Sequence, residues 1–240
     1  MRSFDPRQIL FENRQILVVY KPAGTAVQSG SVGQMDLEHQ LLGYLAMKSS
    51  GRSIPYLAVV HRLDQPVEGI VLFTKTKEAA AACSAQLQNG TMKKEYLAVV
   101  QPSPEKKEAP LDDYLLRERG SNSSKVVRRG TAGAKKASLS YRVLEENDRG
   151  QALLRIQLMT GRHHQIRVQL SHAGMPIVGD RKYGTAEAAA IRKEAGRTGG
   201  RGLALCAASL TFRDPETGRT ETIAISPKGE AFAGFRQVTG

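Results

Sequence analysis

The amino-acid sequence predicts an α+β fold in which a large mixed, mostly antiparallel sheet is flanked by helices. Apolar residues make up 40% of the 240 residues and charged residues 24%, which is ordinary for a globular protein with a buried core. Short β-rich runs outnumber the helical patterns, and the two kinds of segment are unevenly interspersed. This favours an α+β arrangement over a doubly wound parallel sheet.

The expected strands are short apolar or alternating runs bounded by turn residues. The run QILVVY ends at Lys21-Pro22-Ala23-Gly24, a Pro/Gly turn, and Leu154, Ile156 and Leu158 alternate with polar residues. By these criteria strands are expected at 15–20, 56–60, 70–74, 95–100, 139–144, 153–158, 203–212 and 220–225.

Three segments have helical spacing. Over 36–48, apolar side chains recur at i, i+4, i+7 and i+8, and an Ala-rich helix over 77–89 is followed by Gly90 as its stop. A third helix is expected from Arg162 or His163 to Gly174. Its buried stripe would be Ile166, Leu170 and Ala173. Arg167 lies at the edge of that stripe, where a guanidinium needs a carboxylate or phosphate partner unless it reaches solvent.

The pattern along the chain predicts one domain over 1–240. Residues 101–136 and 185–202 mix Pro, Ser, Gly and charge without enough apolar periodicity to bury themselves. We interpret both as flexible surface insertions that become ordered on contact with RNA. Because fewer than about 15 residues precede the first strand, we expect no separate N-terminal RNA-binding domain.

The charge balance indicates a polyanionic partner. Thirty-five Lys and Arg against 23 Asp and Glu give a net charge of +12, spread along the chain rather than gathered in a tail. This favours a basic groove for nucleic acid over a solvated basic surface with no partner. No run of about 18 apolar residues and no secretory signal is visible, and the chain has two cysteines. We therefore expect a cytoplasmic protein, without membrane contact, that acts as a monomer.

Several chemistries are not supported. The sequence has neither GxxxxGK[ST] nor GxGxxG, so no nucleotide cofactor is expected. A metal site at His163, His164 and His172 is disfavoured, because adjacent histidines on a helix point about 100° apart. Cys83 lies in the Ala-rich helix, where a small buried hydrophobe is the simplest interpretation.

One carboxylate stands in a functional position. Asp64 follows a β run in VVHRLDQP, at a strand end, where functional side chains are commonly displayed. The alternative is that Asp64 only caps a turn. Arg167, with its requirement for an anionic partner, is the second candidate.

Three ordered stretches resemble the motifs of the RluA-type family of RNA pseudouridine synthases, which isomerise uridine in ribosomal or transfer RNA. They are HRLDQPVEGIVLFTKTKEAA, KKEYLAVV and LMTGRHHQIRVQLSHAGMPIVGDRKYG. The resemblance begins near Ile16, where LVVYKPAG is similar to the family's first strand and turn, and it extends to the 203–225 strands. It implies the pseudouridine synthase catalytic fold.

The resemblance also implies roles for individual residues. Asp64 would be the catalytic aspartate, Tyr96 the active-site tyrosine and Arg167 the arginine that pairs with the aspartate. Arg62 would help to extrude the target base, and Ile166 would line the pocket. The neighbouring motif residues implied to contact RNA or the base are His61, Leu63, Arg162, His164 and Gln165.

The sequence departs from the family pattern at two places. Val67-Glu68-Gly69 stands where the family usually has Thr-Ser-Gly, which adds an acid near the site. His163 occupies the position of Thr or Ser in GR[TS]HQ[IL]R. Both changes spare the implied catalytic residues, so they bear on substrate preference.

The implied function is the isomerisation of specific uridines to pseudouridine in structured RNA. The reaction breaks the N1–C1′ bond, rotates the uracil and joins C5 to C1′, so we expect no cofactor and no metal. Asp64 would act by covalent attack or by removing a sugar proton, and the sequence leaves both routes open. Tyr96 would stack on the flipped base and relay a proton, or be a core tyrosine on a strand. The alternative functions are a catalytically silent RNA-binding relative, acting in RNA folding or ribosome assembly, and a basic component of an RNA–protein particle.

Overall fold

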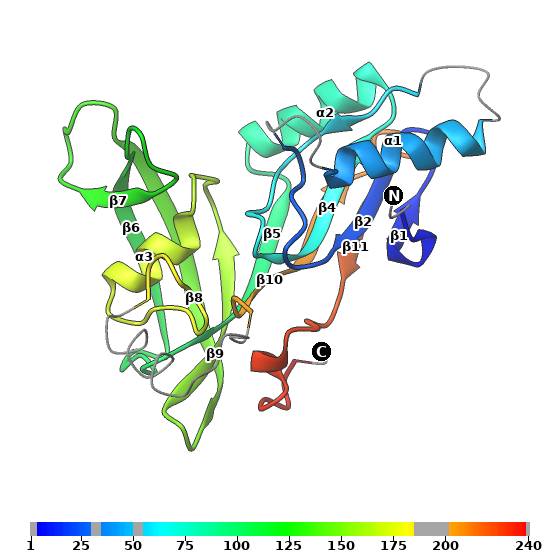
Figure 1. Cartoon of the computed structure of the whole chain (residues 1–240). Helices are drawn as coiled ribbons and strands as arrows, with labels where there is room; N and C mark the ends of the chain where they lie inside the picture. The colour runs from blue at the N-terminus through cyan, green and yellow to red at the C-terminus, as the bar shows by residue number, and fades with distance from the viewer. Residues whose placement is uncertain (1–3, 30–34, 50–54, 185–201, 239–240) are drawn as a thin grey trace. The chain divides into compact units, whose positions relative to one another are not determined.

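The computed structural model describes residues 4–29, 35–49, 55–184 and 202–238. These divide into two compact units, which are considered separately (Figure 1). The first unit is Met1–Lys93 with Ala207–Ile225, and the second is Lys94–Cys206 with Ser226–Gly240. In sequence, Lys94–Cys206 of the second unit is thus inserted between the two parts of the first, and Ser226–Gly240 follows them. That 1–240 forms one domain stays a prediction.

The described chain contains strands, three α-helices and two short 3-10 helices. The strands are β1 (Ile9–Glu12), β2 (Ile16–Lys21), β3 (Ala58–Val59), β4 (Glu68–Thr74), β5 (Lys93–Val100), β6 (Glu108–Arg117), β7 (Ser124–Val127), β8 (Lys135–Asn147), β9 (Gln151–Leu158), β10 (Leu205–Arg213) and β11 (Thr220–Ala224). The helices are η1 (Pro6–Gln8), α1 (Leu37–Lys48), α2 (Lys77–Gln88), α3 (Gln165–His172) and η2 (Glu230–Phe232). None of these described helices is long and apolar enough to span a membrane.

The first unit is organised around strands β2 and β4. Its strand order is β1-β2-β4-β10, with β3 also paired to β4 and β11 paired to β10. Strand β2 runs antiparallel to β4, from the pair Ile16 and Thr74 to the pair Lys21 and Gly69. Every residue of both strands is buried. This continuous burial is expected of a central strand that is covered on both faces.

Helices α1 and α2 form where the sequence predicts them. The Asp36 side chain accepts a hydrogen bond from the backbone N–H of His39 and caps α1, and Thr76 caps α2 in the same way. Helix α2 ends before Gly90, which has a φ of +72°. Residues with a side chain adopt this conformation only at an energetic cost, so glycine is a common helix stop. As predicted, Cys83 is a buried member of the apolar cluster formed with β2 and β4.

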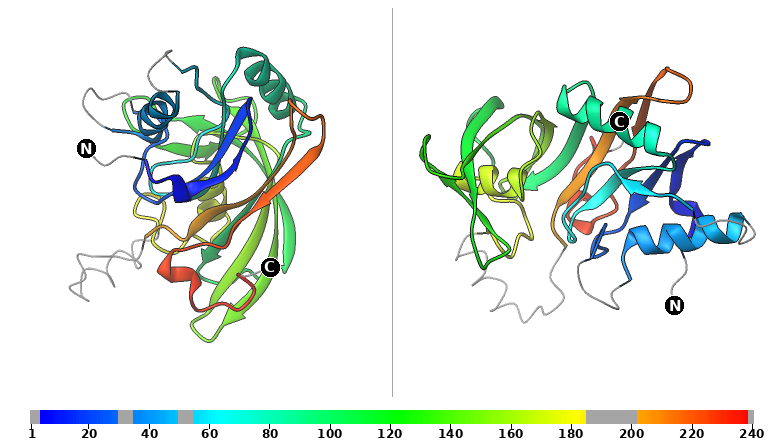
Figure 2. Two further views of the ribbon diagram at one scale, coloured as in Figure 1. Left: turned by 90° about the vertical axis from the view of Figure 1, so that its right-hand side faces the viewer. Right: turned by 90° about the horizontal axis from the view of Figure 1, so that it is seen from above.

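The second unit is an antiparallel sheet that carries helix α3. The strand order is β5-β9-β8-β6-β7, and helix α3 packs against β6 and β7 (Figure 2). Leu115, Ala137 and Val168 form the apolar cluster between helix and sheet. The α+β fold with a mixed, mostly antiparallel sheet is therefore confirmed.

The prediction for residues 101–136 is wrong in part. Strands β6 and β7 lie in this segment, and β6 pairs with β8 over eight residues, from Glu108 to Leu115. Backbone hydrogen bonds build this ladder, and the half-buried β6 side chains give too weak an apolar pattern to be recognised. Of the second predicted insertion, 185–202, all but the last residue lies outside the described residues. The strand expected at 56–60 is shortened to β3.

Helix α3 begins later than the sequence predicts. His164 precedes it with φ 56° and ψ 24°, a left-handed conformation that is incompatible with a helical turn starting at Arg162 or His163. Ile166 and Leu170 are buried as expected, but Ala173 follows the helix and is exposed. The expected three-residue stripe is therefore wrong at its last position.

Candidate active site

The HRLD motif lies in the first unit, on the loop between β3 and β4. The His61 ring accepts a hydrogen bond at Nε2 from the backbone N–H of Leu72 on β4, at 3.2 Å. Leu63 is buried, Arg62 is exposed and Asp64 is half-buried. The carbonyl of Asp64 accepts the backbone N–H of Val67 at 3.0 Å, so the aspartate opens a tight turn.

A buried lysine ties this loop to the turn after β2. Lys21 is fully buried, and its Nζ donates to the carbonyls of Pro22 (3.1 Å), Thr25 (2.7 Å) and Gln65 (3.1 Å). Burial lowers the pKa of Lys21 to about 8, and the negative charges of Asp64 and Glu68 oppose that shift. The ammonium therefore fixes the backbone next to Asp64.

Glu68 lies at the start of β4 and is buried. Its Oε2 accepts a hydrogen bond from the Tyr20 hydroxyl at 2.5 Å. Gly69 follows with φ +131°, and a Cβ there would lie 2.5 Å from the backbone nitrogen and oxygen of Ala207 on β10. Only glycine therefore fits at position 69, where the start of β4 approaches the backbone of β10.

The other predicted site residues lie in the second unit. Tyr96 is on β5, opposite Ile156 of β9, and it is 6% exposed. Arg162 is exposed, and its Nε donates to the Lys136 carbonyl at 2.8 Å. Ile166 is buried in the first turn of α3.

Gln165 connects α3 to the sheet through its side-chain amide. Its Oε1 accepts from Thr160 Oγ1 at 2.8 Å and from the Arg162 backbone N–H at 3.0 Å. Its Nε2 donates to the carbonyl of Ser138 and to the side chain of Gln169. These contacts give Gln165 a structural function, and contact with the base stays a prediction.

Arg167 is buried and forms a bidentate ion pair with Asp180. Nε lies 2.8 Å from Oδ2 and Nη2 lies 2.9 Å from Oδ1. Oδ1 also accepts the backbone N–H groups of Lys182 and Tyr183. Although burial opposes the shift, these donors hold the pKa of Asp180 below its usual value. Arg167 thus has the carboxylate partner that its position requires.

The two adjacent histidines differ from the geometry that the sequence predicts. Their rings stack, with centroids 3.8 Å apart and an interplanar angle of 24°, because left-handed His164 precedes the helix. The expectation that the rings point about 100° apart is therefore wrong. His164 is buried, and its Nδ1 lies 2.7 Å from the Tyr183 hydroxyl. Among the described residues, no group of three or more His, Cys, Asp or Glu side chains is placed to hold a metal ion.

Asp64 belongs to the first unit, and Tyr96 and Arg167 belong to the second. That the aspartate meets the other two residues stays a prediction.

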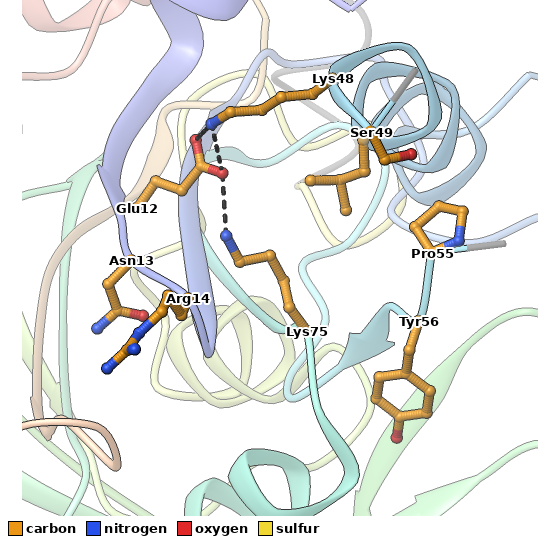
Figure 3. Close-up of a pocket in the computed structure, with 9 residues that line it drawn as sticks. Glu12, Asn13, Arg14, Lys48, Ser49, Pro55, Tyr56 and Lys75 are labelled. Atoms are coloured by element: carbon orange, nitrogen blue, oxygen red, sulfur yellow. Dashed lines mark hydrogen bonds and ion pairs between the residues drawn. The ribbon is translucent and has the colours of Figure 1, made fainter. Parts of the chain in front are cut away.

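The first unit also contains an open pocket of about 570 Å³ (Figure 3). Lys48 and Lys75 turn their ammonium groups toward the Glu12 carboxylate, each at 3.0 Å, beside Pro55 and Tyr56. None of the predicted catalytic or RNA-binding residues is among the described residues that line this pocket. We therefore do not assign the chemistry to it.

Two further residues, Lys21 and Asp180, contact the predicted site residues or the backbone next to them and were not predicted from the sequence. Lys21 is the first residue of the KPAG turn, and a lysine that directly follows a continuous apolar run is a signal for burial. Asp180 is in the quoted GDRKYG stretch, but its pairing with Arg167 depends on a loop conformation that spacing does not reveal.

Comparisons with known proteins identify the family. Residues 15–172 match the RNA pseudouridylate synthase family model, so the chain belongs to the RNA pseudouridylate synthase family. It is 36% identical over 215 residues to the ribosomal large subunit pseudouridine synthase C of Escherichia coli K12, and 35% identical to that of Yersinia pestis. These matches cover 90% of this chain but only 65% and 64% of the relatives' own lengths.

Solved structures show the same fold. Human RNA pseudouridylate synthase domain containing 4 has a TM-score of 0.75 at 24% identity, over 92% of this chain and 89% of that chain. Human RNA pseudouridylate synthase domain containing 1 has a TM-score of 0.70 at 21% identity, over 92% and 83%.

Proposed function

We propose that this protein isomerises specific uridines of large-subunit ribosomal RNA to pseudouridine. The observation that carries the proposal is that Asp64, Tyr96 and Arg167 all lie within the matched residues 15–172. The names of the bacterial relatives favour a ribosomal over a transfer RNA substrate. A ribosomal substrate would place the protein in the cytoplasm, where it is expected to work as a monomer.

In the proposed mechanism, Arg62 helps to displace the target uridine from the RNA, and the base stacks on Tyr96. Arg167, which Asp180 holds through Nε and Nη2, would pair with the Asp64 carboxylate. Asp64 then either forms a covalent bond, which breaks again before the product leaves, or removes a sugar proton, which it returns. The N1–C1′ bond breaks, C5 joins C1′, C5 loses a proton and N1 gains one. These steps balance without a cofactor.

The test is to incubate the purified protein with an unmodified transcript of bacterial large-subunit ribosomal RNA, without added cofactor. Pseudouridine is then mapped by chemical labelling and reverse transcription. We expect product with the wild type and none with Asp64→Asn. Product only in a parallel transfer RNA sample would contradict the ribosomal substrate. RNA binding without product in either sample would instead support a catalytically silent relative.

A further inference from the structure

Residues 114–136, the basic arm, run from the second half of β6 through β7 to the start of β8 and carry a large share of the protein's positive charge. This segment contains seven Lys and Arg and one acid. Its net charge of +6 is half of the chain's net charge of +12. All seven cationic side chains are exposed: Arg117, Arg119, Lys125, Arg128, Arg129, Lys135 and Lys136. Such a density of exposed cations is the electrostatic signature of phosphate binding.

His163 holds the tip of the β6–β7 hairpin, which lies within this arm. Its Nδ1 lies 2.8 Å from Ser124 Oγ, and its Nε2 lies 2.9 Å from Asn122 Oδ1. These contacts bridge two positions of the hairpin with one ring. A Thr or Ser at position 163 is too short to reach both partners.

Two further contacts fix the tip from the loop that follows α3. Lys182 Nζ donates to the Asn122 carbonyl at 2.6 Å, and the Ser124 backbone N–H donates to the Tyr183 hydroxyl at 2.9 Å. The Tyr183 ring also lies 5.1 Å from the Arg167 guanidinium carbon. The residues that hold the hairpin therefore also contact the environment of the predicted catalytic arginine.

We propose that the basic arm binds RNA through its exposed cations, which contact phosphates of the substrate, and that His163 is the positioning residue that fixes this arm to the start of α3. The inference rests on the proposed function, because it takes the RNA substrate from it. It explains why His163 departs from the family pattern without affecting the predicted catalytic residues. A fixed arm loses less conformational entropy on binding than a mobile one.

The experiment measures RNA affinity as a function of salt for four proteins: wild type, Arg119→Glu, His163→Thr and the double variant. The control is Arg219→Glu, which reverses an exposed arginine in the turn between β10 and β11. The RNA is the unmodified large-subunit transcript used above. Circular dichroism confirms that each variant is folded, and Arg128→Glu replaces Arg119→Glu if the latter is not.

We expect Arg119→Glu to raise the Kd for RNA about tenfold. The slope of log Kd plotted against log salt concentration should become smaller in magnitude by about 1. Arg219→Glu should bind like the wild type. His163→Thr should raise KM more than it lowers kcat. In the Arg119→Glu background, His163→Thr should have a smaller further effect on Kd than in the wild type, because the arm that His163 positions already makes fewer phosphate contacts. A general effect of His163 on stability would instead be additive.

The proposal fails if Arg119→Glu, or Arg128→Glu in its place, binds like Arg219→Glu, or if the effects of His163→Thr and the arginine substitution are additive. Either result leaves the proposed function intact as long as the wild type forms pseudouridine. Absence of product with the wild type contradicts the proposed function instead, and the binding measurements still decide the role of the arm.

Discussion

The guanidinium of Arg167 and the carboxylate of Asp180 form a bidentate ion pair, with both side chains almost completely removed from solvent, at 7% and 1% exposure. Removing one member of such a pair leaves an uncompensated buried charge. Asp180 is thus the residue through which the orientation of Arg167 can be tested without changing Arg167 itself.

We expect Asp180→Asn to lower the free energy of unfolding at pH 7 by about 3 kcal/mol, since the amide keeps the shape but loses the charge. Turnover should fall at the same time, because Arg167 is no longer held in place. Denaturant unfolding and single-turnover kinetics measure the two effects. Unchanged turnover in a folded variant would show that Arg167 keeps its position without Asp180.

The same pair makes stability depend on pH. Because the pKa of Asp180 is lowered in the folded protein, its stabilising effect is complete above the unfolded value of 3.8 and is lost as pH falls through the lower folded pKa. The stability difference between wild type and Asp180→Asn should therefore be constant from pH 7 to 5 and shrink below 3.8. A difference independent of pH would contradict the ion pair.

Lys21 predicts a second pH dependence of stability, in the alkaline range. Its pKa is lowered from 10.5 to about 8 on folding, so between these values the unfolded chain binds more protons and stability rises with pH. Relative to Lys21→Met, the wild type should gain roughly 3 kcal/mol from pH 8 to 10.5. Denaturant unfolding at several pH values measures this. Parallel profiles for the two proteins would exclude a shifted lysine.

Gly69 is expected to tolerate no side chain. In Gly69→Ala the Cβ would meet the backbone of Ala207 at 2.5 Å, so we expect a loss of about 3 kcal/mol or more. The matched control is Gly24→Ala. Gly24 also has a positive φ, of +87°, but no atom lies within 4 Å of an added Cβ, and about 1 kcal/mol is expected. Equal losses in the two variants would assign the effect to φ alone.

Asp64→Asn should abolish pseudouridine formation and leave RNA affinity within about twofold of the wild type. The amide preserves the shape of the loop but is neither a nucleophile nor a base. Single-turnover assays with excess enzyme, together with a binding isotherm, separate the two quantities. If one tenth of the wild-type rate remained, Asp64 would not be the catalytic group.

Tyr96→Phe tests stacking against proton transfer. The ring is kept, so RNA should bind normally. If the hydroxyl moves a proton, turnover should fall at least ~100-fold. Tyr96→Ala should also lose affinity, since a stacked base contributes about 1 to 3 kcal/mol. Turnover of Tyr96→Phe close to that of the wild type would limit Tyr96 to packing or stacking.

Features with strong local signals could be predicted from the sequence. The run at 15–20 gave β2, and the cap residues Asp36 and Thr76 stand at the ends of the two helices predicted from apolar spacing. Strand β6 was missed because its stability comes from backbone pairing with β8 rather than from buried side chains.

For the candidate site, the sequence predicted which residues belong to it but not the contacts that those residues make. The motifs pointed to Asp64 and Arg167, but the partners Lys21 and Asp180 are defined by loop conformations formed from distant segments. The left-handed His164 is a further example. Its φ is fixed by tertiary contacts such as the Tyr183 hydroxyl, and residue preference alone would have placed the helix start earlier.

The close approach of Gly69 to Ala207 has a consequence for biosynthesis. The strand that packs on the start of β4 is separated from it by more than a hundred residues, and it is synthesised late. On the ribosome, the segment Met1–Lys93 therefore emerges long before strand β10, and the part of the β4 edge that β3 does not cover remains unpaired during that interval. We expect the nascent chain to need protection from strand pairing with other chains until β10 has been translated.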